Sequence, residues 1–190
     1  MNKDRVAELD RLRPYLIKKF EQWLKEQHRL YLPTAQPLPK YAKSHLSGYF
    51  ERRTLDLVRV ATVERIRNPD FYASLERAGI PVPLDFSTAV GLTVIDLILI
   101  RKELIRHRAS FMSTLFHEMV HVVQIDILGL KRHIELYADS LREGGYQYHT
   151  VVLERQAYTL STRFDRGEPP FSVEKVVRQE LEHYLSLIHI

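Results

Sequence analysis

The sequence predicts an α+β domain, because two stretches typical of β-strands lie in its first half and helical periodicity fills most of its second half. Its 190 residues are enough to bury a sizeable core in one domain. Hydrophobic side chains make up 45% of the chain and charged side chains 27%, which is typical of a globular protein and excludes wholesale disorder. No internal repeat or low-complexity tract divides the chain, so we expect one structural unit overall.

An amphipathic helix is expected over the first thirty residues, because apolar residues recur every three or four positions among charged ones. Pro14 either begins a second helix at its first turn or kinks a longer one. Three prolines between residues 31 and 40 predict an extended connector. We therefore distinguish an N-terminal helix with its Pro-rich connector, residues 1–40, from a main domain, residues 41–190. The apolar stripe of the helix consists of Val6, Leu9, Leu12, Leu16, Phe20 and Leu24.

Two strands are expected in the first half of the main domain. Residues 55–66 (LDLVRVATVERI) are rich in β-branched side chains with partial alternation, and residues 90–100 (VGLTVIDLILI) form a nearly continuous apolar run. Between them a short helix is expected from Pro69 to Ala78, and Gly79 ends it. The second run predicts a strand that is buried on at least one face.

Four helices are expected in the rest of the chain. Ser110 or Ser113 is a candidate cap for a helix that runs to Gly129, and a Gly-Gly pair at residues 144–145 closes the next one. Ser172 is expected to cap the last helix. The apolar stripes of the last three helices are Ile134, Tyr137, Ala138 and Leu141; Leu153, Ala157, Leu160 and Phe164; and Val173, Val176, Val177, Leu181, Tyr184 and Ile188.

The first of these helices contains an HExxH motif, within the segment FHEMVHVVQ of residues 116–124. His117 and His121 are four residues apart, so both imidazoles project from one helix face and can reach the same cation. Glu118 projects to the side, where a water bound to that cation would lie. The motif therefore predicts two metal ligands and a general base, Glu118.

The third ligand is expected to be a carboxylate from a later helix. The motif helix is apolar almost all round and should be buried, and a zinc ion would relieve the cost of burying three ionisable groups together. The metzincins place a further His or Asp six residues after the second His, where this chain has Ile127. Glu154 is the best candidate, because it lies at the edge of an apolar stripe and the small Ala157 lets its helix approach closely. Weaker candidates are Glu135, Asp139, His133 and His149.

The pair HEMVH and LERQAY resembles the gluzincin branch of the zinc metallopeptidases, and more narrowly small bacterial members with an HExxHVVQ helix and a downstream ExxAY helix. The resemblance covers roughly residues 88–166. It implies a compact zincin-like fold, with a small twisted and mainly antiparallel sheet, an HExxH active-site helix and a following ligand helix. It also implies that Zn²⁺ is bound by His117, His121 and Glu154, with Glu118 polarising the water.

The same resemblance implies a donor for the oxyanion, commonly Tyr or His in this family. Tyr148 and His149 lie in the loop after the glycine pair, within chain reach of the metal. Tyr158 is a further candidate. It stands four residues after the ligand Glu, where thermolysin-like members carry an Asp that bonds to the first zinc histidine, so it is also a candidate for that role.

Substrate contacts are expected from three places. In zincins an edge strand near the motif helix pairs with the peptide, and the run from Val90 to Ile100 occupies that place in the chain order. Its residues Leu97, Ile98 and Leu99 are the candidates for this contact, and the alternative is that the run is simply a core strand. Gln124 falls on the histidine face of its helix, where it lines the cleft or solvates the helix. Tyr146 lies in the loop after the glycine pair.

Composition narrows the cofactors and partners. The chain has no Cys, which excludes disulfides, thiol nucleophiles and thiolate zinc sites, so a metal must be held by His and carboxylates. There is no apolar run of about 18 residues and no signal-peptide pattern, so we expect a cytoplasmic protein without membrane contact. A net charge of +4 does not favour nucleic acid as a partner, and the basic run of residues 101–108 is expected to be a solvated connector.

These features together predict a zinc-dependent metallopeptidase that hydrolyses a peptide or protein substrate. One alternative is a non-catalytic, zinc-stabilised binding module on a zincin scaffold. A second is a regulatory protease specific for one DNA-associated partner, which the basic run would contact. A third is that His117 and His121 are core histidines without a metal. The sequence leaves the oligomeric state open.

Overall fold

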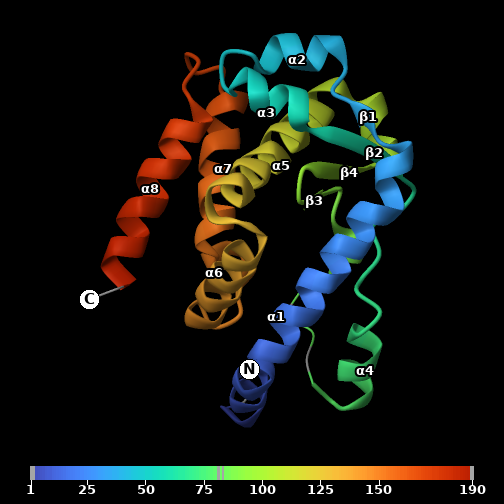
Figure 1. Ribbon diagram of the computed structural model, residues 1–190, viewed down its shortest axis with the longest axis vertical. Coiled ribbons are helices and arrows are strands. Elements are labelled where there is room, and N and C mark those ends of the chain that lie inside the picture. The colour runs from blue at the N-terminus through green and yellow to red at the C-terminus, as the bar shows by residue number, and fades with distance from the viewer. Residues whose placement is uncertain (1–2, 81, 83, 189–190) are drawn as a thin grey trace.

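The structure, a computed structural model, describes residues 3–80, 82 and 84–188. Its helices are α1 (Lys3–Tyr31), α2 (Lys40–Leu46), α3 (Arg52–Leu57), α4 (Tyr72–Arg77), α5 (Arg108–Leu128), α6 (Leu130–Glu143), α7 (Val152–Asp165) and α8 (Val173–Ile188). Its strands are β1 (Gln36–Pro37), β2 (Arg59–Val63), β3 (Gly91–Val94) and β4 (Leu97–Arg101). The sheet lies between α1 on one face and α5 on the other, with α7 and α8 packed beyond α5 (Figure 1). The prediction of an α+β domain with a small sheet is confirmed.

The sheet is mixed and has the strand order β1-β2-β4-β3. The two outer pairs are antiparallel, whereas the central pair, β2 with β4, is parallel. The expectation of a mainly antiparallel sheet is therefore correct for the outer pairs and wrong for the central one. Side chains alternate along β4, with Ile98 and Ile100 in the core on the α5 side and Leu97 and Leu99 in the core on the α1 side. Burial on both faces explains the nearly continuous apolar run.

Both predicted strands differ from the observed ones. Residues 55–66 supply the strand β2, which is only five residues long because α3 extends to Leu57. Residues 90–100 form a hairpin of two strands, β3 and β4, instead of one strand. The chain reverses at Ile95 and Asp96, and Ile95 has a left-handed φ of 66°. β-branched residues rarely adopt this conformation, and the turn contains no Gly or Asn. The sequence therefore gives no local signal for a turn at this place.

The helices predicted for the second half of the chain are confirmed, with shifted boundaries. α5 begins at Arg108, before both serines that we expected to cap it. Ser113 instead donates a hydrogen bond from Oγ to a carboxylate of α7 over 2.7 Å. Ser172 caps α8 as expected, because its Oγ accepts a hydrogen bond from the Lys175 amide over 3.3 Å. The short helices α2 and α3 are additional to those that the periodicity predicts.

α1 is continuous, with Pro14 inside it, and packs along the main domain. Trp23 and Leu24, in its second half, are buried in the core formed with the β3-β4 hairpin. In its first half, an ion pair of 2.6 Å between Arg13 and Asp139 joins it to α6. This position of α1 makes it one wall of the cavity described below.

Candidate metal centre

Three predicted ligands converge where α5 packs against α7. The Nε2 atoms of His117 and His121 lie 3.2 Å apart, and Oε2 of Glu154 lies 3.3 Å from the first and 3.4 Å from the second. Helical spacing brings the two imidazoles together. The fully buried Ala157, in the core cluster shared by both helices, allows the close helix packing that brings Glu154 to them. Among the described residues, these three form the group of side chains that can hold a metal ion.

The triangle of donor atoms fits a tetrahedral cation. Edges of 3.2–3.4 Å belong to a tetrahedron whose centre lies about 2.0 Å from each corner, which matches zinc–nitrogen and zinc–oxygen distances. Oε2 of Glu154 is buried and has no hydrogen-bond partner, so this oxygen is available to a cation. Two imidazoles and one carboxylate are also a donor set that suits zinc, and three protein ligands leave a fourth position for water or substrate.

The charges of the triad stabilise one another. Burial alone would lower the pKa of His121, but the Glu154 carboxylate outweighs it and raises this pKa to about 9. Burial alone would raise the pKa of Glu154, but the charge on His121 and the closeness of both imidazoles hold it well below its usual range. Glu154 is therefore ionised, as a metal ligand must be.

Gln124 does not line the cleft as expected. It is fully buried behind His121, where its Oε1 lies 2.7 Å from Nδ1 of that imidazole. An amide oxygen at this position accepts the Nδ1 proton, so in the neutral imidazole that a metal requires the lone pair lies on Nε2, the atom that faces the other two candidate ligands. The spacing of Gln124 placed it on the correct helix face but did not indicate that α7 covers this part of the face.

Tyr137 orients the third ligand, a role that the sequence did not indicate. Its hydroxyl donates a hydrogen bond to Oε1 of Glu154 over 3.0 Å, which turns Oε2 toward the imidazoles. Burial, together with the charge of Glu154, raises the pKa of Tyr137 well above its usual value, so the hydroxyl remains a donor. In the sequence Tyr137 is one position of an apolar stripe on α6, which gave no separate signal.

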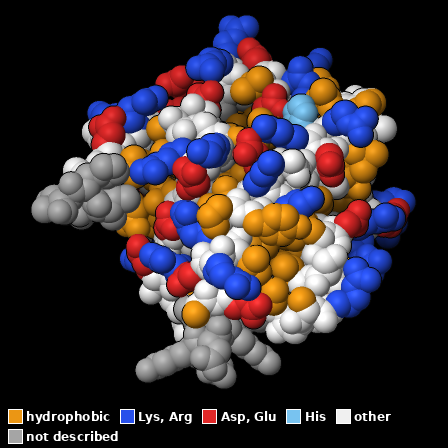
Figure 2. All heavy atoms as spheres, turned by 60° about the horizontal axis from the view of Figure 1, so that its bottom comes forward, with side chains coloured by type: hydrophobic (Ala, Val, Ile, Leu, Met, Phe, Trp, Pro, Cys, Tyr) orange, Lys and Arg blue, Asp and Glu red, His pale blue; other side chains and the backbone are white. Residues whose placement is uncertain are grey.

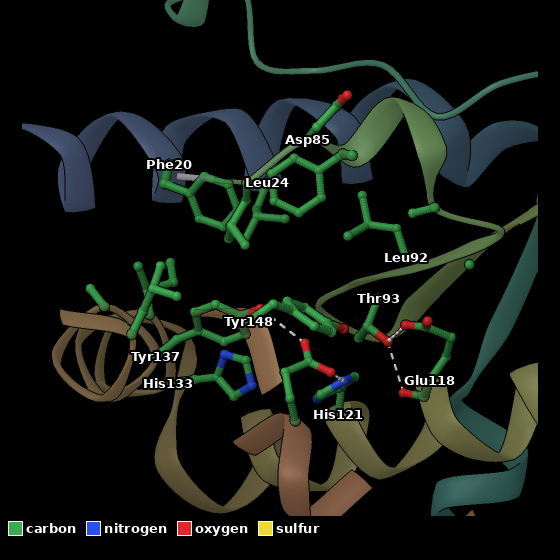
Figure 3. Close-up of a pocket in the computed structure, with 18 of the residues that line it drawn as sticks. Phe20, Leu24, Asp85, Leu92, Thr93, Glu118, His121, His133, Tyr137 and Tyr148 are labelled. Carbon is green, nitrogen blue, oxygen red and sulfur yellow. Dashed lines mark hydrogen bonds and ion pairs between the residues drawn. The ribbon is translucent and has the colours of Figure 1, made fainter. Parts of the chain in front are cut away.

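Strand β3 holds Glu118. The Thr93 hydroxyl lies 2.7 Å from Oε2 of Glu118 and 2.8 Å from its backbone oxygen (Figure 3). A Cβ at Gly91 would lie only 2.8 Å from Oε1 of Glu118, so the glycine makes room for the carboxylate. Glu118 is 7% exposed, so it is oriented by the strand and largely shielded from water. A glycine inside a strand pattern is the sequence signal for such a close approach.

Glu118 and the three ligands line one cavity of about 880 Å³. On its opposite wall, Phe20 and Leu24 of α1 face Thr93, Glu118 and His121 (Figure 3). Most of the lining is apolar, polar groups surround the triad, and further charged side chains come from α1 and α6. A concave site of this size with mainly apolar walls is typical of substrate and ligand sites.

Comparisons with known proteins do not supply a relative. No protein-family model, curated protein or solved structure matches the chain. The resemblance to gluzincins therefore depends on the motif and on the distances and burial given above.

The candidate oxyanion donors differ in position. Tyr148 and Tyr158 line the cavity, and the Tyr158 ring centroid lies 4.5 Å from that of His117. Tyr148 is 41% exposed as a whole, yet burial of its phenol and the nearby Glu154 carboxylate raise its pKa, so its hydroxyl stays protonated. His149 is exposed on the same 3-10 turn and is not among the cavity-lining residues. The geometry therefore does not support His149 as a catalytic residue.

The expectation that Leu97, Ile98 and Leu99 belong to an edge strand is wrong. Leu97, Ile98 and Leu99 belong to β4, which is paired on both sides and is at most 2% exposed at these positions. The edge strand beside the motif helix is β3, and its residues from Gly91 to Thr93 line the cavity. The expectation fails because a turn at Ile95 and Asp96 divides the predicted strand into two, and the second of these strands lies inside the sheet. Tyr146, the remaining candidate for substrate contact, does line the cavity.

The weaker ligand candidates lie outside the triad. Glu135 pairs with Lys131 over 3.3 Å, and Asp139 pairs with Arg13. His133 is buried in the cavity wall, with its ring centroid 6.2 Å from that of His121. Burial and the neighbouring charge of His121 lower the pKa of His133 to about 3, so this imidazole is neutral.

The basic run is partly neutralised by neighbours. Arg101 pairs with Glu103 over 2.6 Å and Lys102 with Glu64 over 2.9 Å. On the face seen in Figure 2, Lys and Arg side chains are interspersed with Asp and Glu, so this face carries no continuous basic patch. Within the described residues, no helix has the length and apolar character that crossing a membrane requires.

Proposed function

We propose that this protein is a zinc-dependent peptidase with a zincin-like fold that hydrolyses a peptide or protein substrate in the cytoplasm. One observation carries the proposal. Two imidazole nitrogens and one carboxylate oxygen lie 3.2–3.4 Å apart, and Glu118 lies in the same cavity with its carboxylate held by Thr93. The buried Oε2 of Glu154, which has no hydrogen-bond partner, supports a bound cation over a pair of ordinary core histidines.

Each side chain has a defined task in amide hydrolysis. Zinc bound by His117, His121 and Glu154 would lower the pKa of a water molecule and polarise the scissile carbonyl. Glu118 takes the proton from the attacking water and delivers it to the leaving nitrogen. Tyr148, which stays protonated, donates a hydrogen bond to the developing oxyanion.

The edge strand supplies a surface for the substrate. β3 pairs with β4 on one side only, and its cavity side is free of other strands among the described residues. An extended peptide that pairs with β3 would bring its backbone past Glu118, which contacts Thr93 of the same strand. This arrangement favours a peptide substrate over a small molecule.

The proposal is tested by metal analysis together with one substitution. The purified protein should contain about one zinc per chain and cleave unfolded protein substrates. Glu118→Gln should retain the zinc and lose hydrolysis, because the amide cannot accept the proton. Glu135→Gln on α6, which lies outside the triad, should retain both and is the matched control.

Three results would contradict the proposal in different ways. Zinc without cleavage of any substrate would indicate the non-catalytic binding module. No bound zinc after incubation with Zn²⁺ would indicate core histidines. Full activity in Glu118→Gln would remove Glu118 from the reaction.

A further inference from the structure

A chain of hydrogen bonds leads from His121 to the surface of α8. Nδ1 of His121 lies 2.7 Å from Oε1 of Gln124, and Nε2 of Gln124 lies 2.9 Å from Oε1 of Gln156. Nε2 of Gln156 then donates to Oε2 of Glu180 over 2.7 Å. The two glutamines are at most 7% exposed, whereas Glu180 is exposed on α8. We call this set, His121, Gln124, Gln156 and Glu180, the amide chain.

The direction of every bond in the amide chain is fixed by two groups that can only accept, the Leu153 carbonyl and the Glu180 carboxylate. Nε2 of Gln124 also lies 3.0 Å from the Leu153 carbonyl oxygen, which can only accept, so this end of the amide must be the NH₂ group. Its oxygen therefore faces His121 and requires a proton on Nδ1. At the other end, the Glu180 carboxylate requires the NH₂ group of Gln156. Each group thus has one orientation, and in the neutral imidazole that a metal requires the lone pair of His121 lies on Nε2.

We propose that Gln124, Gln156 and Glu180 are positioning residues for the metal centre, and this inference rests on the proposed zinc site. The amide chain fixes both the tautomer and the ring orientation of His121. It also extends the metal centre to α8, which lies outside the part of the chain that resembles gluzincins. Partners of this kind behind a metal-bound histidine typically change metal affinity about 10–100-fold when they are removed.

The first experiment measures metal binding directly. Zn²⁺ affinity is determined by competition with a chromophoric chelator, and the coordination of Co²⁺ is followed by its visible absorption spectrum. Gln124→Met keeps the length of the side chain but removes the acceptor for Nδ1. It should lower the Zn²⁺ affinity about 10–100-fold and change the Co²⁺ spectrum, because His121 is no longer held in one orientation.

The second experiment reverses the direction of the amide chain. Gln124→Glu keeps an acceptor for His121, but its second oxygen faces Oε1 of Gln156, so the Gln156 amide must turn over. After turning, Gln156 presents its oxygen to the Glu180 carboxylate, which also only accepts. Glu180→Gln supplies the missing donor. The double variant should therefore unfold at a higher denaturant midpoint than Gln124→Glu alone. In both variants the new carboxylate faces the Leu153 carbonyl oxygen, so this unfavourable contact cancels from the comparison.

Positions 124 and 180 do not share a hydrogen bond, so rescue of one by the other requires Gln156 between them. Glu182→Gln, a charge removal at an exposed position on the same helix, is the matched control and should not rescue Gln124→Glu. Equal Zn²⁺ affinity of Gln124→Met and the native chain, or a double variant no more stable than Gln124→Glu, would overturn the inference. If the native chain itself binds no zinc, the proposed function fails first, and the two failures are thereby distinguished.

Discussion

At the scale of single residues, the candidate site depends on how the carboxylate of Glu118 is held. Thr93 binds one of its oxygens, and Gly91 leaves space for the other. Both residues come from β3, whereas Glu118 comes from α5, so the strand fixes the side of the cavity on which the proposed general base lies. The position of a proton acceptor to within a fraction of an ångström affects the rate of proton transfer strongly.

Gly91→Ala is expected to displace Glu118 and reduce hydrolysis by at least about tenfold, while the zinc content remains unchanged. The added Cβ would lie 2.8 Å from Oε1 of Glu118 and 2.7 Å from Cγ2 of Thr114, closer than such atoms can approach. Activity with a peptide substrate and zinc content by elemental analysis are measured on the same preparation.

Thr114→Ser distinguishes the effect of the contact with Thr114 from the effect of the contact with Glu118. It removes the methyl group that the new Cβ would strike but leaves the contact with Glu118 in place. The double variant Gly91→Ala with Thr114→Ser should therefore regain thermal stability without regaining activity. Recovery of activity in the double variant would mean that Gly91 serves the packing of Thr114 and not the placement of the general base.

At the scale of elements, the β3-β4 hairpin decides which strand lies next to the cavity. Its two-residue turn has a positive φ at Ile95 only, which is the pattern of a type II′ turn and favours Gly at that position. An isoleucine there costs about 1–2 kcal/mol in a left-handed conformation. The fold maintains this backbone conformation because the contacts that follow it compensate the cost. β4 is buried on both faces, and the Asp96 carbonyl accepts a hydrogen bond from the Arg59 amide over 3.1 Å.

Ile95→Gly is therefore expected to leave the free energy of unfolding unchanged or to raise it by up to about 1 kcal/mol, in spite of the apolar surface that it removes. Urea unfolding measures the effect. The control is Ile105→Gly, since Ile105 is 49% exposed and has no positive φ; this change should lower the free energy of unfolding by about 0.5–1 kcal/mol. Equal destabilisation by both changes would show that the turn at Ile95 is not strained.

The same hairpin shows how far the sequence alone predicts the fold. Long periodic segments, such as α1 and α8, are predicted well because an apolar stripe repeats many times along them. A reversal at Ile95 is not predicted, because its turn is imposed by the packing of β4 and not by local turn residues. The short helices α2 and α3 are missed for a similar reason, since few turns give little periodicity.

The candidate site likewise contains residues that the sequence predicts and residues that only the structure reveals. His117, Glu118 and His121 follow from spacing within one helix, and Glu154 follows from the stripe of a second helix. The groups that orient them, such as Thr93 and the amide of Gln124, act across contacts between elements far apart in the chain. No single sequence reveals which polar residue faces which ligand until the elements are packed, so these roles became visible only in the structure.

At the scale of the whole molecule, the candidate metal centre joins three parts of the fold. α5 and α7 supply the three candidate ligands, and α6 supplies Tyr137, which donates a hydrogen bond to Glu154. The ionisable groups of the triad are mostly buried, and their burial opposes folding unless their charges and donors are matched. A cation that binds only the folded chain supplies this match and stabilises the folded state by an amount that grows with the logarithm of its free concentration above the dissociation constant.

Zinc is accordingly expected to raise the thermal stability of the protein. A free Zn²⁺ concentration about a thousandfold above the dissociation constant adds about 4 kcal/mol to the free energy of unfolding, and a chain of this length gains about 2–4 °C in Tm per kcal/mol. Calorimetry with Zn²⁺ against calorimetry with a chelator should therefore show a Tm difference of about 8–16 °C. His117→Ala and Glu154→Ala should abolish most of this difference, because each removes one corner of the triangle. Glu118→Gln should preserve it, because Glu118 is not a ligand in the proposed site. A Tm difference that survives in both ligand variants would place the stabilising zinc elsewhere on the protein and separate it from the HExxH helix.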